Sequence, residues 1–405
     1  MKQFLPLFSS LFLLSVGSLI AQEKINPAKL IDFENYLTTE IDSGKIAGIE
    51  VLIHHKEKTV WHKALGYNNL IDKRPLEKNS IYFIQSMTKP IMSVAIMQLV
   101  EQGLLSLDDE VADFIPAVST LRVIKDINTG IEGATVAMKS PMTIKQLLTH
   151  TAGLSHGLGE HLFDQQLFKL MYNDLFDPAV YKKLEEPVEK LLQVPLIGQP
   201  GEQWYYSAAP DLLALILQNI TQQPINDYLD EHIFTPLGMH DTAYNVSPEN
   251  LDRVMQVHFN QEDGALVTSH VQAKATGNTV YGGTYGLFSS THDYLKFCQM
   301  ILNKGVLNGE QILSPETVME MTKNNVGELI GPSRGFGLGF GVLYATENDP
   351  SPANSGQIYW GGFFKTHFFI DPKAELIALI MTQKIPNTNE YIVALNRAVY
   401  SALEK

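Results

Sequence analysis

The sequence predicts an α/β (α+β) fold, in which an antiparallel sheet flanked by helices carries an inserted all-helical domain. Strand-like and helix-like patterns occur at both ends of the chain, whereas residues 111–245 show mostly helical spacing broken by Pro and Gly. The chain has 405 residues, 45% of them hydrophobic and 18% charged, which is enough for a large packed core. We therefore expect residues 22–110 and 246–405 to form one α/β domain around a helical domain at 111–245.

The N-terminal part of this domain is expected to contain a helix, two strands and a second helix. Residues 26–44 have helical periodicity, and IAGIEVLIHHKEKTVWHKALGY predicts two strands around the polar turn at 55–58. Apolar residues then recur at helical spacing from Ser86 to Gln102, and Gly103 is a suitable residue for the end of that helix.

The C-terminal part returns to short strands and closes with a helix. RGFGLGFGVLY alternates glycine with apolar residues and predicts a strand, since a phosphate-binding loop needs a different glycine spacing. YWGGFFKTHFFIDP and AELIALIMTQ predict two adjacent antiparallel strands. Residues 389–405 have the spacing of a helix.

The first 21 residues have the pattern of a secretory signal peptide. One lysine precedes an apolar run from Phe4 to Ile20, and the chain turns polar after Ala21. We expect cleavage near Ala21 and a secreted protein in the periplasm. The alternative is a membrane anchor, although a run of about 17 residues is at the short limit for a span. No later segment is apolar enough to cross a bilayer, so no membrane span is expected after cleavage.

The net charge argues against one class of partner, and the cysteine count excludes an intramolecular disulfide. The formal net charge of −14 argues against nucleic acid, because phosphate binding needs a basic surface. Cys298 is the only cysteine, so no intramolecular disulfide can form. Its place in a helical apolar stripe predicts a small core residue and not a nucleophile. The sequence gives no indication of an oligomeric state.

The stretch IQSMTKPIMS could place a serine nucleophile next to a lysine that acts as its base. Positions i and i+3 share a helix face, so Lys89 can reach Ser86. Proline is tolerated in the first helical turn, so Pro90 places the start of the helix near Ser86. The positive end of the helix dipole disfavours a protonated lysine, and a desolvated lysine can act as a base at neutral pH. The alternative is that Ser86 caps the helix and Lys89 is solvated.

Several motifs in order resemble one family. They are IYFIQSMTKPIMSVAIMQLVEQGLLSLDDEVADFIP, TIKQLLTHTAGL, PGEQWYYSAAPDLLALIL, IFTPLGMHDTAY, GGTYGLFSSTHDYLKFCQMILNKG and WGGFFKTHFFIDP. Together they resemble the serine β-lactamase-like family, which holds class C β-lactamases, penicillin-binding D-alanyl-D-alanine peptidases and family VIII carboxylesterases. The resemblance implies the β-lactamase/transpeptidase-like fold.

The resemblance also implies roles for individual residues. Ser86 would be the nucleophile, with Lys89 and Tyr206 moving protons; Tyr206 is preferred to Tyr205 because the family's W-x-Y-S pattern starts at Trp204. The oxyanion hole would be formed by the backbone N–H groups of Ser86 and Phe363. The substrate-binding strand motif would be Trp360, Gly361 and Gly362. No metal and no organic cofactor are implied.

Two departures from the family pattern bear on the substrate. Ala208 replaces an asparagine that would hold a β-lactam amide, and Trp360 replaces a lysine that would pair with the antibiotic's carboxylate. The S-M-T-K and W-G-G motifs are most similar to the esterase subgroup. We expect a carboxylesterase-like serine hydrolase that cleaves small acyl esters through an acyl-serine intermediate. We interpret Lys365 as a surface or rim charge.

Other functions remain open. A β-lactamase or D-alanyl-D-alanine carboxypeptidase acting on an amide would need Lys365 or Arg334 as carboxylate partner, and a non-catalytic cell-envelope protein could retain the fold. Gly153–Gly157 also fits G-x-S-x-G, but this nucleophile elbow must follow a strand, and here it follows a helical pattern. A metal site is conceivable but is not expected, because H-E-x-x-H and cysteine partners are missing; its candidate ligands would be His150, His156, Glu160 and His161.

Overall fold

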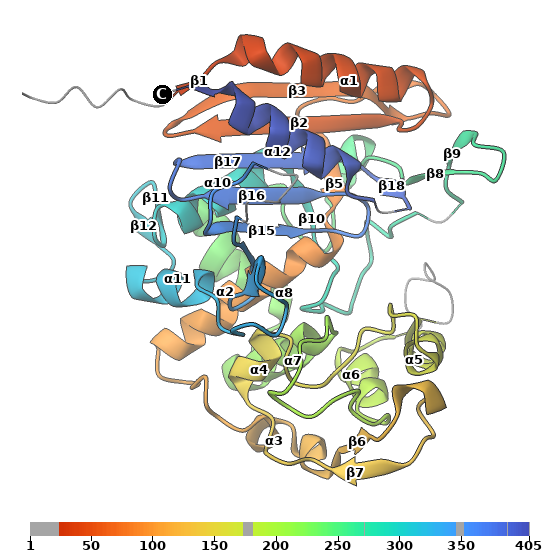
Figure 1. The fold of residues 1–405 in the computed structure, drawn as a ribbon, viewed down its shortest axis with the longest axis vertical. Helices are drawn as coiled ribbons and strands as arrows, with labels where there is room; N and C mark the ends of the chain where they lie inside the picture. The colour runs from red at the N-terminus through yellow and green to blue at the C-terminus, as the bar shows by residue number, and fades with distance from the viewer. Residues whose placement is uncertain (1–23, 173–180, 271, 346–351, 387, 405) are drawn as a thin grey trace, which may run out of the picture.

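The computed structural model describes residues 24–172, 181–270, 272–345, 352–386 and 388–404. The expected signal peptide at 1–21 lies outside these residues. Within them, no helix combines the length and the apolar character needed to span a membrane. Figure 1 shows a broad sheet with α1 and α12 on one side and the helical middle of the chain on the other.

The main sheet has eight strands in the order β13-β14-β15-β16-β17-β2-β3-β4, and every neighbouring pair is antiparallel. Near its centre, β17 (Leu376–Met381) pairs with β2 (Gly48–His55). A strand from the end of the chain thus lies beside one from its beginning, so both termini build one α/β domain. The other strands of the sheet are β3 (Lys58–Asn69), β4 (Arg74–Pro75), β13 (Arg334–Phe336), β14 (Gly341–Leu343), β15 (Gln357–Gly361) and β16 (His367–Asp371).

Both faces of this sheet are covered, which the alternation along β17 explains. Leu376, Ala378 and Ile380 pack in the core beneath α1 (Ile31–Asp42) and α12 (Glu390–Ala402). The intervening residues point to the opposite face and join the core formed with α2 (Thr88–Glu101) and α10 (Thr291–Leu302). Since side chains alternate between faces, a strand covered on both sides reads as a continuous apolar run. These intervening residues are Ile377, Leu379 and Met381.

The middle segment is mainly helical, but it also contains an antiparallel pair, β6 (Arg122–Ile124) with β7 (Thr135–Ala137), which an all-helical expectation omits. Thr143 starts α4 through a capping box with Gln146. Figure 1 shows these helices below the sheet, and α7 packs against α2. The helices are α3 (Val111–Phe114), α4 (Ile144–Leu148), α5 (Leu162–Tyr172), α6 (Glu185–Leu191), α7 (Ala209–Thr221), α8 (Ile225–Leu229) and α9 (Thr235–Leu237).

The strand predictions hold for β2 and β3, and two others need correction. RGFGLGFGVLY is not one strand but the hairpin β13–β14, and Gly339 within its turn has a φ of +91°. The first of the two C-terminal strands is likewise a hairpin, β15–β16, closed by a hydrogen bond from Gly362 N–H to Thr366 O of 2.7 Å. When a short turn itself contains apolar residues, the alternating pattern of the two strands continues through it. The turn therefore cannot be recognised from the sequence pattern.

The remaining elements are short except for α11. They are β1 (Lys24–Ile25), β5 (Ile81–Phe83), β8 (His258–Asn260), β9 (Leu266–Thr268), β10 (Phe288–Ser290), β11 (Val306–Leu307), β12 (Glu310–Gln311), β18 (Lys384–Ile385), β19 (Leu403–Glu404), α11 (Pro315–Thr322), and the helical turns η1 (Pro27–Leu30), η2 (Gln85–Met87), η3 (Pro116–Thr120), η4 (Ile127–Thr129), η5 (Asp230–Phe234) and η6 (Pro248–Arg253).

Candidate active site

The segment that carries Ser86 is a tight strand-to-helix turn. β5 leads into η2 and then directly into α2. Pro90 lies in the first turn of α2, where the missing proline N–H costs no helical hydrogen bond. Gln85, just before Ser86, has a φ of +48°, a left-handed conformation that costs a non-glycine residue roughly 1–3 kcal/mol. Ser86 therefore sits at the start of helical structure, where backbone N–H groups have no intrahelical partner.

Lys89 is buried beside Ser86 and is not solvated. Its side chain is 1% exposed, and Nζ lies 3.2 Å from Ser86 Oγ. Nζ also donates a hydrogen bond of 2.9 Å to the carbonyl oxygen of Thr284. Burial lowers the pKa of Lys89 to about 7, against the opposing effect of the Asp211 carboxylate. A lysine with this pKa is partly neutral at physiological pH and can accept a proton.

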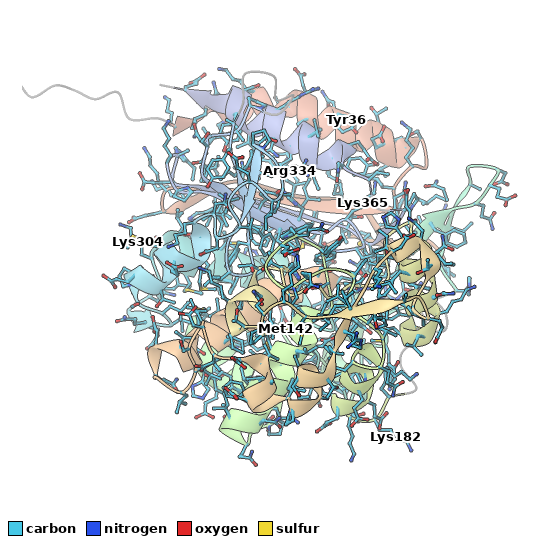
Figure 2. All side chains as sticks on the ribbon, turned by 60° about the horizontal axis from the view of Figure 1, so that its bottom comes forward. Tyr36, Met142, Lys182, Lys304, Arg334 and Lys365 are labelled. Atoms are coloured by element: carbon cyan, nitrogen blue, oxygen red, sulfur yellow. The ribbon has the colours of Figure 1, made fainter. Side chains whose placement is uncertain are left out.

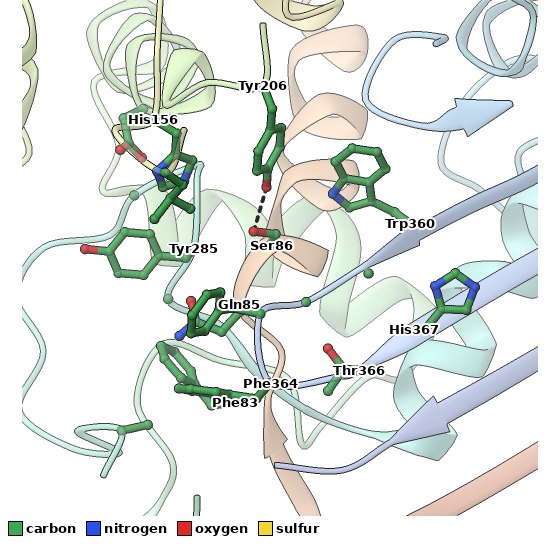
Figure 3. Close-up of a pocket in the computed structure, with 18 of the residues that line it drawn as sticks. Phe83, Gln85, Ser86, His156, Tyr206, Tyr285, Trp360, Phe364, Thr366 and His367 are labelled. Carbon is green, nitrogen blue, oxygen red and sulfur yellow. Dashed lines mark hydrogen bonds between the residues drawn. The ribbon is translucent and has the colours of Figure 1, made fainter. Parts of the chain in front are cut away.

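Tyr206 approaches Ser86 from the loop before α7. Its hydroxyl donates a hydrogen bond of 2.7 Å to Ser86 Oγ (Figure 3), and its ring centroid lies 4.6 Å from Lys89 Nζ. Burial raises the pKa of Tyr206 far above its usual value, although the hydrogen bond to Ser86 acts in the opposite direction. The phenol therefore keeps its proton at neutral pH. The neighbouring Tyr205 hydroxyl instead bonds to Gln203.

The predicted substrate-binding motif at residues 360–362 lies at the end of β15, beside Tyr206. The Trp360 ring lies 5.6 Å from the Tyr206 ring, between their centroids. Gly362 follows β15, and a Cβ there would lie 2.4 Å from the carbonyl oxygen of Ile84. Glycine is thus required because the strand end packs against the backbone just before Ser86. Phe363 comes next and lines the same pocket as Ser86; its role as an oxyanion donor stays a prediction.

A pocket of about 920 Å³ opens over Ser86. Trp360, Gly361 and Gly362 all contribute to its wall. The charged side chains among its described lining are Asp211, Lys274 and Arg334. The helical segment contributes mostly apolar and aromatic residues to the wall, beside His156 and Asp211. They include Leu158, Phe168, Met171, Tyr172, Tyr181, Leu184, Pro187, Trp204 and Tyr206.

Ser155 has a structural environment. It lies in the loop after α4, with no strand before it, and its hydroxyl donates a hydrogen bond of 2.5 Å to Asp164 Oδ1. Ser155 Oγ also accepts a hydrogen bond of 3.0 Å from the N–H of Gly157. A nucleophile elbow needs an exposed hydroxyl on a strand-to-helix turn. The Ser155 hydroxyl therefore stabilises its own loop, and the G-x-S-x-G alternative is not supported.

The histidines considered as metal ligands have other partners. His150 Nδ1 lies 2.9 Å from Ser207 Oγ, and His156 Nδ1 lies 3.0 Å from the Tyr172 hydroxyl. Burial lowers the pKa of both, that of His156 to about 3, so both rings are neutral. In the part of the chain that the structure describes, no group of three or more His, Cys, Asp or Glu side chains is placed to hold a metal ion.

The interpretation of Lys365 as a surface or rim charge is wrong. Its side chain is 3% exposed and forms an ion pair of 2.5 Å with Glu390, in the first turn of α12. It also donates a hydrogen bond to Thr388 and lies over the Tyr391 ring. The β15–β16 turn folds the side chain towards the start of α12. Its spacing after W-G-G gave no sign of this partner, which lies 25 residues later.

Sequence reasoning missed two residues next to Lys89. Thr284 supplies the carbonyl that holds Nζ, and Asp211 is a buried carboxylate whose charge acts on the lysine. An acidic residue in the otherwise apolar run APDLLALIL was an available signal for Asp211. A backbone carbonyl such as that of Thr284 leaves no signal in a single sequence.

Residues 33–401 match the profile of the family described as Beta-lactamase. The chain belongs to this family. The match confirms the family predicted from the sequence, and with it the fold class. The family assignment covers nearly the whole α/β domain and the helical segment.

Relatives in this family include esterases. Esterase EstB of Burkholderia gladioli is 27% identical over 383 residues, which cover 88% of this chain and 91% of the relative. Lovastatin esterase of Penicillium rubens is 28% identical over 378 residues, covering 85% of this chain and 90% of the relative. Protein Rv1367c of Mycobacterium tuberculosis is 29% identical over 365 residues, covering 85% and 88%.

Solved structures agree on the fold. EstCE1, described as a hydrolase with promiscuous acyltransferase activity, superposes with a TM-score of 0.80 at 24% identity and covers 92% of this chain and 99% of its own. Unliganded simvastatin synthase (LovD) from Aspergillus terreus gives 0.77 at 21% identity, covering 92% and 98%. The family match and the esterase relatives, and not these structures, identify the chain as a serine hydrolase, as the sequence predicted.

Proposed function

We propose that this chain is a carboxylesterase-like hydrolase that cleaves uncharged esters through an acyl-Ser86 intermediate. The observation that carries the proposal is the placement of Ser86 Oγ between the Tyr206 hydroxyl at 2.7 Å and Lys89 Nζ at 3.2 Å. A serine becomes a nucleophile when an adjacent base takes its proton, and a lysine near neutrality is such a base. The S-M-T-K and W-G-G motifs favour the esterase subgroup of the family.

Acylation begins with Lys89 as the base, because Tyr206 is protonated at neutral pH. As neutral Lys89 takes the Ser86 proton, Oγ bonds to the ester carbonyl carbon and the carbonyl electrons move to its oxygen. The N–H groups of Ser86 and Phe363 would stabilise this oxyanion. Collapse of the tetrahedral intermediate breaks the bond to the alcohol oxygen, which takes a proton from Tyr206, and Lys89 then reprotonates Tyr206.

Deacylation repeats these steps with water. Neutral Lys89 accepts a proton from water through Tyr206, and the water oxygen attacks the acyl carbon. The second tetrahedral intermediate releases the carboxylic acid, and Ser86 recovers its proton. In this scheme Tyr206 relays protons in both directions, which suits a hydroxyl bonded to Ser86 Oγ, while Lys89 stores the proton between steps.

The pocket wall suggests the class of ester. Trp360 stands where a lactamase would present a lysine, so this position offers an apolar surface to the substrate. A pocket of about 920 Å³ is in the size range that holds drug-sized ligands. A small acyl group, as expected from the sequence, therefore leaves room for a bulky alcohol part.

The N-terminal pattern supports export as part of the proposal. We infer that the leader at residues 1–21 directs the chain to the periplasm and is removed near Ala21. Mass spectrometry of the mature N-terminus from a periplasmic extract would test this; an uncleaved chain held in the membrane fraction would contradict it.

A β-lactamase or carboxypeptidase activity is the second candidate, and the position of Arg334 favours it. Lys365 is paired with Glu390, so of the two cations considered for a substrate carboxylate only Arg334 lines the pocket. Arg334 is the first residue of β13, at the edge of the main sheet, and both cations are labelled in Figure 2. Arginine binds carboxylates in a bidentate manner.

Initial rates on p-nitrophenyl butyrate and on a chromogenic cephalosporin separate the candidates. We expect ester turnover in the wild type and in Ser155→Ala, and none in Ser86→Ala. Faster turnover of the cephalosporin than of the ester would move the assignment to β-lactamase. Absence of turnover and of any covalent adduct with an acyl donor would support a non-catalytic protein of the cell envelope.

A further inference from the structure

Asp211 is joined to Lys89 through one loop residue. Asp211 is the third residue of α7 and is 8% exposed. Its Oδ1 accepts the N–H of Thr284 at 2.9 Å, and the carbonyl of the same Thr284 accepts the hydrogen bond from Lys89 Nζ at 2.9 Å. The Asp211 carboxylate thus holds Thr284 in place, and Thr284 in turn holds Lys89.

The loop is shaped to make this contact. A Cβ at Gly282 would lie 2.7 Å from Asp211 Oδ1, and one at Gly283 would lie 2.1 Å from the carbonyl oxygen of Pro210. Both approaches are closer than a side chain allows, so the two glycines let the loop press against the start of α7. The Thr284 hydroxyl adds a hydrogen bond of 3.3 Å to the carbonyl of Ala208.

We propose that Asp211 is a positioning residue for the acyl-transfer reaction, which holds Lys89 against Ser86 through Thr284 and sets the pH range in which Lys89 acts as a base. The proposal rests on the function proposed above. Asp211 takes no proton from the substrate in this scheme; it acts through Lys89.

The charge of Asp211 has a defined direction of effect. Burial raises the pKa of Asp211, whereas the Thr284 N–H and Lys89 favour its charged form. An ionised carboxylate near Lys89 opposes the effect of burial on the lysine, so it keeps more of Lys89 protonated. The other titratable groups that face this pair are His150, His156, Tyr172, Tyr206, Tyr244 and Tyr285, none of which is anionic at neutral pH.

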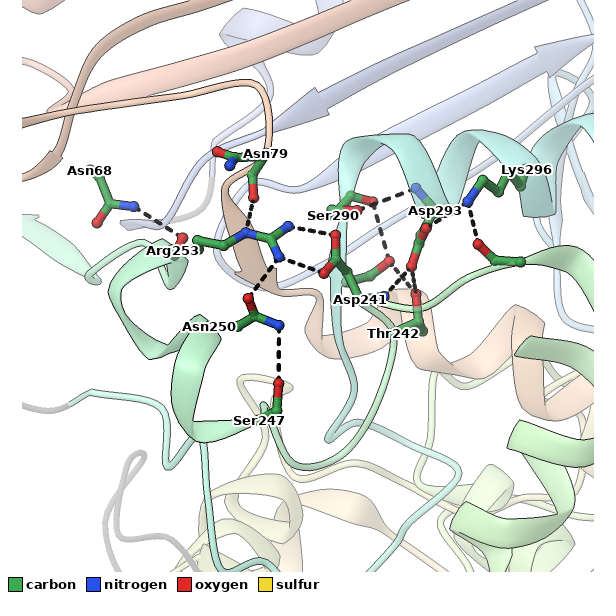
Figure 4. A network of polar contacts seen from close by, with 12 residues as sticks. Asn68, Asn79, Asp241, Thr242, Ser247, Asn250, Arg253, Ser290, Asp293 and Lys296 are labelled. Atoms are coloured by element: carbon green, nitrogen blue, oxygen red, sulfur yellow. Dashed lines mark hydrogen bonds and ion pairs between the residues drawn. The ribbon is translucent and has the colours of Figure 1, made fainter. Parts of the chain in front are cut away.

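Two substitutions separate the charge of Asp211 from its hydrogen bond. Asp211→Asn keeps an oxygen for the Thr284 N–H and removes the charge, whereas Asp211→Ala removes both. The matched control is Asp293→Asn, since Asp293 is also buried but lies in a separate network with Asp241, Thr242 and Lys296 (Figure 4).

Two measurements are made on the full chain across pH. One is the rate at which a fluorophosphonate probe labels Ser86, followed by intact mass. The other is NMR titration of ¹³Cε-labelled lysine, with the Lys89 signal assigned as the one lost in Lys89→Met. Both work without a known substrate, so a wild type that labels but hydrolyses no ester would reject the proposed esterase function and still decide the role of Asp211.

We expect Asp211→Asn to move the acid limb of labelling and the Lys89 titration about one pH unit lower, the size of shift that a nearby charge produces. Asp211→Ala should also lower the maximal labelling rate by about tenfold or more, because a small misplacement of a catalytic group can cost up to about a hundredfold in rate. An unchanged Lys89 titration in Asp211→Asn would overturn the proposal, as would the same shift in Asp293→Asn.

Discussion

The hydroxyl of Tyr206 lies 2.7 Å from Ser86 Oγ, although the two residues are 120 positions apart in the chain. Ser86 starts the helical structure that leads into α2, and Tyr206 stands just before α7, which packs against α2. The contact between these two helices therefore fixes the distance between a nucleophile and its proton relay.

We expect Tyr206→Phe to lower kcat for ester hydrolysis by about 10²–10⁴, the usual contribution of a positioned proton donor. The substitution keeps the buried ring and removes only the hydroxyl that bonds to Ser86. Tyr205→Phe is the matched control, because the Tyr205 hydroxyl bonds to Gln203 and not to Ser86. Equal losses in the two variants would contradict the assignment of Tyr206.

The pH dependence of kcat/KM should report Lys89. Its neutral amine is the active form, which exists above a pKa of about 7, so activity falls as pH drops through this value. Lys89→Arg keeps a cation that cannot lose its proton, and we expect no measurable turnover at any pH. A wild-type profile that stays flat from pH 5 to pH 8 would show that another group is the base.

Gly362→Ala should destabilise the fold. Its Cβ would lie 2.2 Å from Thr366 Oγ1 and 2.4 Å from Ile84 O, so the turn or the segment before Ser86 must shift. We expect a loss of about 1–3 kcal/mol in the free energy of unfolding, typical of overpacking. Gly361→Ala, whose nearest contact would be 3.1 Å, should cost less in the same denaturant titration. The opposite order would mean that the strand end is free to move.

Arg334→Met should distinguish substrates by charge. Arg334 lies in the pocket wall, so its loss removes a partner for a substrate carboxylate but no group used on a neutral ester. We expect the acylation rate with a cephalosporin to fall by about tenfold or more, as for a lost charge-assisted hydrogen bond, while p-nitrophenyl butyrate hydrolysis changes little. A matching fall with both substrates would indicate a structural role.

The sequence was sufficient for the family, the fold class and the grouping of Ser86, Lys89 and Tyr206, because each of these depends on local patterns in a fixed order. The sequence did not predict contacts whose partner lies far away along the chain and outside any motif. Lys365 was interpreted as a surface or rim charge, yet its ion pair is formed only when the β15–β16 turn lies against the start of α12. Asp211 acts on Lys89 through the backbone of Thr284, a relation that only the folded chain creates.

The central pairing of β17 with β2 has a consequence for how the chain acquires its structure. These strands come from opposite ends of the chain. They can therefore pair only after almost the whole chain has been synthesised. Contacts between distant segments form slowly, whereas the helices of the middle segment are built from neighbouring residues. We expect pulsed hydrogen exchange during refolding to find α7 protected before β17; simultaneous protection would indicate that sheet and helices fold as one unit.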